Sequence, residues 1–148
     1  MVIIGLIRGV LADMVSDTNS KLKSYQYNDK PTANVRLDTK NPSPTAVLMQ
    51  LTDWDMVIGK GILTEEANIN VTFLSKENKM DADGVQQEAI IDDMRDLAVE
   101  FIQRVREIQS IRIEDDTVRV KSVFLASDSN RTGVNITLTI KQKQGSCL

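Results

Sequence analysis

The side chains that most often perform acid–base, nucleophilic and metal chemistry are almost absent from this chain of 148 residues. It contains no histidine, and its single cysteine is Cys147, one residue from the end. Histidine-dependent triads, Cys–His catalysis and cysteine-rich zinc sites are therefore excluded. A lone thiol forms no disulfide within the chain, which suits a reducing compartment, and we assign Cys147 no role.

The remaining candidate motifs are incomplete. Residues 128–133 (DSNRTG) repeat the first half of an EF-hand loop, but Thr139 stands where the glutamate ligand belongs and strand patterns flank the segment. A hairpin turn is the better interpretation. Residues 59–61 (GKG) lack the frame of a phosphate-binding loop. Glu65 and Glu66 are neighbours on an expected strand and point to opposite faces, so they form no catalytic pair. We expect no catalytic, cofactor-binding or metal-ligating residue and no cofactor.

The composition indicates one globular domain spanning residues 1–148. Hydrophobic residues make up 41% and charged residues 26% of the chain, as in ordinary folded proteins. The net charge of -3 argues against a protein that coats nucleic acid by bulk charge. Residues 2–15 are apolar but lack the basic start of a signal peptide and are interrupted by Arg8. No stretch approaches the roughly 20 apolar residues of a membrane span, so we expect no membrane contact.

Two segments have the periodicity of amphipathic helices. Apolar residues recur at spacings of three and four over residues 2–15, where Gly5 and Gly9 either pack in the core or form a seam against a neighbouring subunit. A longer helix is predicted over residues 83–109, with Asp83 near its N-terminus and a charge order that suits the helix dipole. Its apolar stripe consists of Ile90, Met94, Leu97, Phe101, Val105 and Ile108.

Alternating apolar residues predict strands, and polar clusters predict the turns between them. The expected strands cover residues 47–51, 67–73, 111–113, 118–124 and 134–140. The expected turns lie at residues 52–55, 115–116 and 128–133, and the glycines of residues 59–61 indicate a second turn or a bulge. Residues 16–44 are polar and rich in breakers, which predicts an interaction arm, a loop or an irregular region with a short strand around Val35 and Leu37.

This order of elements predicts an α+β fold. We expect a mainly antiparallel sheet of about four to five strands, with the N-terminal helix and the long amphipathic helix packed on one face.

The element order resembles that of small neck and tail-completion proteins of tailed bacteriophages and prophages, often called tail terminators. The resemblance covers about two thirds of the chain and is one of pattern, without a short diagnostic motif. It rests on the strand at 67–73, the helix at 90–108, the strands at 118–124 and 134–140, and the ending KQKQGSCL, joined by the opening helix and the strand at 44–51.

The resemblance implies a non-enzymatic virion structural protein, made in the cytoplasm of the bacterial host. Such proteins form homo-oligomeric rings, usually hexamers, that terminate the tail and join it to the head–tail connector. The implied partners are further copies of the chain, the tail tube and the connector or stopper proteins, with DNA passing through the lumen without specific binding. Alternatives are another neck, stopper or tail tube subunit or, from a different class, a cytosolic α+β binding or regulatory module. An enzyme ranks third.

Three surfaces are nominated for subunit contacts: residues 16–44, residues 53–61 and the C-terminal tail. Trp54 is expected to pack in the core, with the anchoring of a partner as the alternative. Arg119 and Lys121 join the lysines near the C-terminus either in a modest basic stripe or on a solvated sheet edge. The candidate contact residues are Asp53, Trp54, Asp55, Lys60, Lys141 and Lys143.

Overall fold

The computed structural model describes residues 2–28, 42–51, 53–76, 84–125, 131–142 and 146–147. Within these residues, two helices accompany one mixed sheet of seven strands, which confirms the α+β class but exceeds the expected four to five strands. The elements are α1 (Val2–Ser16), β1 (Ser24–Asn28), β2 (Thr45–Met49), β3 (Trp54–Gly59), β4 (Ile62–Lys76), α2 (Gly84–Arg106), β5 (Ile111–Leu125), β6 (Arg131–Gln142) and β7 (Ser146–Cys147).

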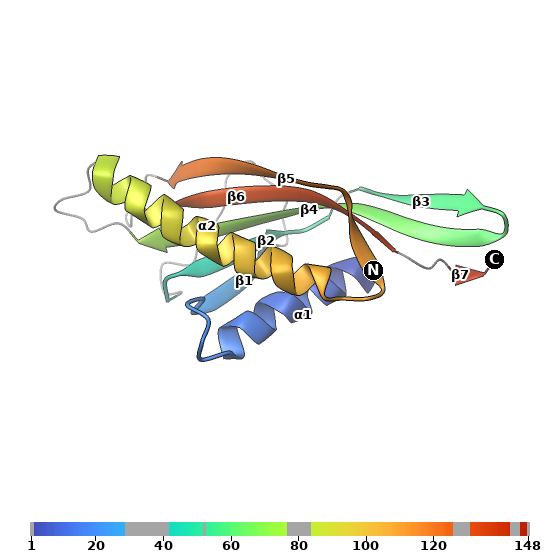
Figure 1. Ribbon diagram of the computed structural model, residues 1–148, viewed down its shortest axis with the longest axis horizontal. Helices are drawn as coiled ribbons and strands as arrows, with labels where there is room; N and C mark the ends of the chain where they lie inside the picture. The colour runs from blue at the N-terminus through green and yellow to red at the C-terminus, as the bar shows by residue number, and fades with distance from the viewer. Residues whose placement is uncertain are drawn as a thin grey trace.

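Strand β4 is the centre of the sheet, whose order is β1-β2-β4-β6-β5 (Figure 1). On one side, β2 pairs with the second half of β4 and β3 pairs with its first half, so β2 and β3 follow one another along the same edge. On the other side, β6 pairs with residues 66–76 and β7 with Ile62 and Leu63. All these pairs are antiparallel, whereas β1 runs parallel to β2.

The parallel strand β1 arises within residues 16–44, the polar segment expected to be an arm, a loop or an irregular strand region. Leu22 is buried just before β1, and the main chain of Lys23 donates a hydrogen bond to the carbonyl of Pro44. The start of this segment is therefore anchored to the core and supplies an edge strand. The short strand expected around Val35 and Leu37 lies outside the described residues.

Both helices cover one face of the sheet, which we call the helix face, and together with it they enclose one core (Figure 1). Helix α1 buries the side chains predicted by its three-and-four spacing: Ile3, Ile7, Val10, Leu11 and Met14. The sheet buries Ala67, Ile69, Val71 and Phe73 of β4 and Val134, Ile136, Leu138 and Ile140 of β6, as their alternation predicted. The rings of Phe73 and Phe101 lie 5.8 Å apart in a tilted arrangement, which joins α2 to the centre of the sheet.

The apolar stripe of α2 is buried most completely toward the C-terminal half of the helix. Met94, Leu97 and Phe101 are buried, whereas Ile90 is only partly covered. The helix ends at Arg106, so Ile108 belongs to the following turn. Asp83, expected at the helix N-terminus, lies outside the described residues.

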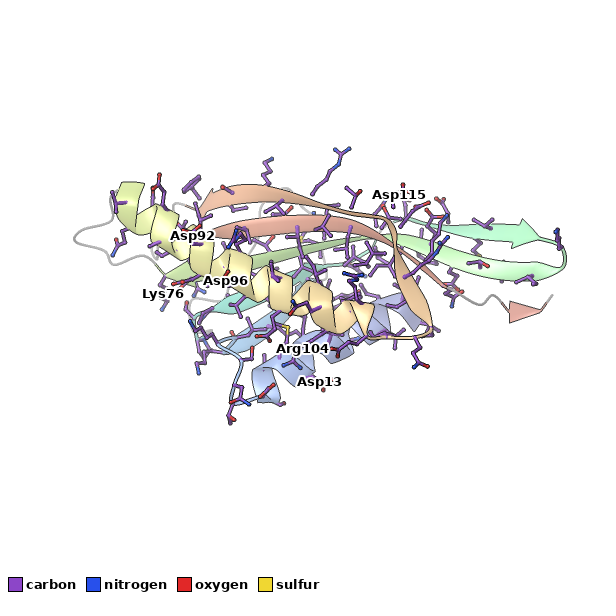
Figure 2. All side chains as sticks on the ribbon, viewed as in Figure 1. Asp13, Lys76, Asp92, Asp96, Arg104 and Asp115 are labelled. Atoms are coloured by element: carbon purple, nitrogen blue, oxygen red, sulfur yellow. The ribbon has the colours of Figure 1, made fainter. Side chains whose placement is uncertain are left out.

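Near its C-terminus, α2 is tied to the end of α1 by an ion pair. Arg104 lies between the two helices, with its Nη2 atom 2.7 Å from Oδ2 of Asp17 and its Nε 3.3 Å from Oε2 of Glu100 (Figure 2). The pKa of Asp17 is lowered, first by a hydrogen bond from the main-chain N–H of Asn19 and then by Arg104. The pair fixes the relative position of the helix ends.

Two expected turns are strand instead. Trp54 and Asp55 begin β3, because the chain continues along β4 after a short break following β2. Asp115 lies near a bend in β5, where a register shift between Ile113 and Val118 marks a β-bulge (Figure 2). A bulge accommodates the polar pair at 115–116 without ending the strand, and Asp115 takes a positive φ of 56° there.

The last three residues of the expected turn at 128–133, Arg131, Thr132 and Gly133, belong to β6 instead and are buried. Residues 128–130 lie outside the described residues. In β2, Ala46, Val47 and Leu48 are all buried, with Ala46 and Leu48 on the helix face, so the expected alternation of Val47, Met49 and Leu51 does not separate a buried face from an exposed one.

The two glycines of α1 lie at the surface of the helix. Gly5 and Gly9 lie on the exposed side of α1, where an added methyl group would meet no atom within 4 Å, so core packing does not explain them. Among the described helices, neither combines the length and apolarity that crossing a membrane requires.

Candidate interaction surface

The β3–β4 hairpin projects beyond the part of the sheet that the helices cover (Figure 1). Its turn consists of Lys60 and Gly61, whose φ angles are 53° and 78°. Positive values at both central positions are required by a type I′ turn, whose twist matches that of the flanking strands. The turn expected at residues 59–61 is therefore confirmed. At the tip, β7 covers the edge of β4 opposite β3.

The hairpin exposes large apolar side chains. Every residue of β3 is exposed, and the exposed fractions of Trp54, Met56 and Ile58 are 48%, 55% and 67%. Trp54 is paired with Ala67, a core residue on the helix face, and cross-strand partners share a face. Trp54, Met56 and Ile58 thus continue the apolar helix face beyond the helices, and the main expectation that Trp54 packs in the core is wrong.

The opposite side of the hairpin is more polar. Asp55 is paired with Glu66, and both point to the face on which Asn68 and Asn70 lie, which we call the polar face. On this face, the side-chain amide of Asn135 donates hydrogen bonds to Asn70 Oδ1 at 2.6 Å and to Thr72 Oγ1 at 2.8 Å. Hydrogen bonds between side chains thus connect β4 and β6 on the polar face.

A second exposed apolar region lies on β5, at the opposite edge of the sheet. Val120 and Phe124 are each 57% exposed and share the helix face with their partners on β6, such as Ile136. Arg119 and Lys121 alternate with them and point to the polar face. Within the described residues, β5 pairs only with β6 and β3 only with β4, so each presents an unpaired strand edge.

Three charged side chains meet on the polar face near the base of the hairpin. Nζ of Lys141 lies 2.7 Å from Oε1 of Glu114 and 3.5 Å from Oε2 of Glu66. Contact with Glu114, followed by burial, raises the pKa of Glu66, while the hydrogen bond from Lys141 lowers the pKa of Glu114. Lys141, expected as a partner contact, is therefore engaged within its own chain and does not extend a free basic stripe. A groove of about 450 Å³ adjoins this cluster.

This cluster predicts a pH effect of Glu66→Gln. Because the folded chain holds the Glu66 proton more tightly than the unfolded chain, Glu66 makes the wild type lose stability as the pH rises from the ordinary glutamate value through the raised pKa. Glutamine removes this loss and still donates a hydrogen bond to Glu114. In urea unfolding between about pH 4 and pH 7, we expect the stability of the variant to fall less than that of the wild type.

Glu88→Gln, at an exposed position on α2 outside the cluster, is the matched control, and its curve should run parallel to the wild type. Parallel curves for Glu66→Gln as well would contradict the proposed coupling of the two carboxylates.

The six nominated contact residues divide into three groups. Asp53, Trp54, Asp55 and Lys60 belong to the hairpin or its entry and are exposed. Lys141 lies in the ion-pair cluster, and Lys143 is outside the described residues. Sequence reasoning nominated residues 53–61 as a surface without singling out Met56 and Ile58, and it missed Val120 and Phe124 as surface residues. The available signal was the apolar run at 56–58 directly before a two-residue turn, which is apolar on both faces, unlike a half-buried strand.

The described part of the chain offers contact surfaces at this site and no arrangement typical of a metal centre. Among the described residues, no group of three or more cysteines, aspartates or glutamates is placed to hold a metal ion. Comparison with known protein families and with curated proteins finds no match for the chain. Fold and site therefore define an α+β domain with a projecting hairpin.

Proposed function

We propose that the protein is a non-enzymatic structural subunit that assembles with copies of itself into a ring in the neck of a tailed-phage virion. The ring terminates the tail and joins it to the head–tail connector. The single observation that supports self-assembly is the β3–β4 hairpin, which carries Trp54, Met56 and Ile58 into solvent beyond the core. The place in the virion is supported by the resemblance of the element order to tail-completion proteins.

Exposure of this kind is unfavourable unless a partner covers it. Each fully buried side chain of this size contributes roughly 1.5–3 kcal/mol relative to its exposed state, so the hairpin gains stability when another surface covers it. Contiguous exposed apolar patches commonly mark protein interaction sites, and aromatic residues such as Trp54 are frequent anchors there.

Partners of the ring are the tail tube and the connector or stopper, and DNA passes through its lumen.

The test is the mass of the purified full chain by light scattering over a range of concentrations, followed by negative-stain imaging. We expect closed rings of uniform size. Extended tubes would favour a tail tube subunit of the same particle. A chain that stays monomeric up to its solubility limit would contradict self-assembly and favour the cytosolic binding module.

A hairpin variant adds a prediction with its own control. Replacing both Met56 and Ile58 by threonine keeps β-propensity but removes apolar surface at exposed positions. We expect assembly to weaken by at least roughly tenfold in concentration while the unfolding midpoint changes little. Val85→Thr, at an apolar residue of α2 that is 75% exposed, is the control and should leave assembly unchanged.

A further inference from the structure

We infer that the unpaired edge of β3 in one copy pairs with the unpaired edge of β5 in the next copy, so that the two sheets continue into one another. This inference rests on the proposed self-assembly and names the surfaces that make the contact. The partner is thus a second copy of this chain, bound through two different surfaces.

The free edges of β3 and β5 lie on opposite sides of the sheet. In the strand order β1-β2-β4-β6-β5, the free edge of β3 faces the β1 side of the sheet and the free edge of β5 faces the opposite side. Within one chain the sheet is open, and β4 and β6 lie between these two edges (Figure 1). A contact between two different patches of identical chains is heterologous, and it generates a ring when the rotation closes.

Both edges present exposed apolar side chains on the helix face. Strand β3 presents Trp54, Met56 and Ile58 there, and β5 presents Val120 and Phe124, all about half exposed or more. If the edges pair, these residues become neighbours on one continuous apolar surface. Lateral contacts between neighbouring strands would then bury part of each patch.

On the polar face, the two edges carry opposite charges. Asp55 of β3 points to this face, as do Arg119 and Lys121 of β5. Pairing the edges places the carboxylate beside two cations, whereas pairing β5 with β5 would place like charges together. One arrangement thus matches apolar with apolar on one face and opposite charges on the other.

The arrangement also fixes the geometry of the assembly. Strand β3 is paired with residues 62–67 of β4, whereas Val120 and Phe124 lie level with its other end, near residues 71–75. The copies are therefore displaced along the strand direction, and the strands are inclined to the ring axis as in β-barrels.

The experiment exchanges charges between the two edges in the full chain. Asp55→Lys alone places a third cation beside Arg119 and Lys121 at the contact, and Lys121→Asp alone places a second aspartate beside Asp55 and leaves only Arg119 as a cation. We expect each variant at low salt to need a concentration at least roughly tenfold higher to assemble. A 1:1 mixture restores opposite charges at every contact in an alternating ring. We expect the mixture, and the single chain with both substitutions, to assemble within about threefold of the wild-type concentration.

Matched controls make the same charge changes at exposed sites away from both edges. These are Asp92→Lys on α2 and Lys21→Asp before β1, and both should assemble like the wild type. Circular dichroism and urea unfolding of every variant establish that the fold is intact.

The outcomes separate this inference from the proposed function. Wild-type rings with unaffected Asp55→Lys and Lys121→Asp variants would overturn the β3–β5 contact and leave self-assembly standing. Impaired single variants that the mixture fails to restore would also overturn the contact, because the two residues would then belong to different interfaces. A wild type that never assembles would overturn both.

Discussion

Replacing Gly133 with alanine is expected to destabilise the protein by about 3 kcal/mol or more, a large share of the roughly 5–15 kcal/mol that stabilises a typical domain. A Cβ atom at Gly133 would lie 1.8 Å from the main-chain oxygen of Phe73 and 2.8 Å from its carbonyl carbon. The residue is paired with Leu74 on one side and Val123 on the other, so β6 cannot move away from β4 without losing the central pairing of the sheet. Urea unfolding measures the loss directly.

Gly9→Ala is the matched control. Gly9 is exposed in the middle of α1, and an added Cβ would meet nothing within 4 Å, so alanine should stabilise the helix by about 0.5–1 kcal/mol. A Gly133→Ala variant as stable as the wild type would show that the contact between β4 and β6 is looser at this point than the structure places it.

Replacing Phe101 with alanine is expected to cost about 3–5 kcal/mol. The side chain is fully buried in the well-covered half of α2 and contacts the ring of Phe73, so its removal leaves a cavity between helix and sheet. Phe101→Asp should be worse, because an unpaired charge would occupy the same site. Thermal and urea unfolding distinguish these variants, and the aspartate variant should be recovered largely unfolded.

Phe124→Ala controls for the residue type. Its ring is 57% exposed on β5, so the same substitution should change the free energy of unfolding little and act on assembly instead. Ile90→Asp should lie between these cases, because Ile90 is only partly covered. Equal losses for Phe101→Ala and Phe124→Ala would contradict the placement of the core on the helix face.

The sequence predicted the elements whose periodicity is set by one buried face. Both helices and strands β4 and β6 follow this rule, and their core residues were largely identified from spacing alone. Prediction from periodicity failed where a strand is buried on both faces or exposed on both faces. Val47 and Leu48 are both buried in β2, so the alternation there carried no phase, and β3 is exposed throughout, so its start was predicted as a turn. The bulge at Asp115 depends on pairing with β6, which no local pattern encodes.

The candidate site was predicted only by region. Residues 53–61 were nominated, and Asp55, Lys60 and Trp54 are exposed there, yet Trp54 was expected mainly in the core. Whether an apolar residue lies under a helix or beyond its end is decided by tertiary structure, since Trp54 and Ala67 share a face but differ in burial. The same holds for Val120 and Phe124, whose alternation is identical to that of a covered strand.

The pairing of β4 with β6 can form only after β6 has been synthesised, so the sheet is completed late in synthesis. Asn70 and Asn135, which hydrogen bond across this pair, are 65 residues apart, so the sheet closes only through contacts distant in sequence, and such topologies fold slowly. Helix α1 is made early, but its apolar side has no complete sheet to cover it until β6 has left the ribosome. An emerging chain therefore carries the hairpin before it has a finished β5 edge, the edge that we propose receives another copy. In the proposed ring, assembly would therefore wait for the C-terminal strands, and unfinished chains would be protected from premature polymerisation.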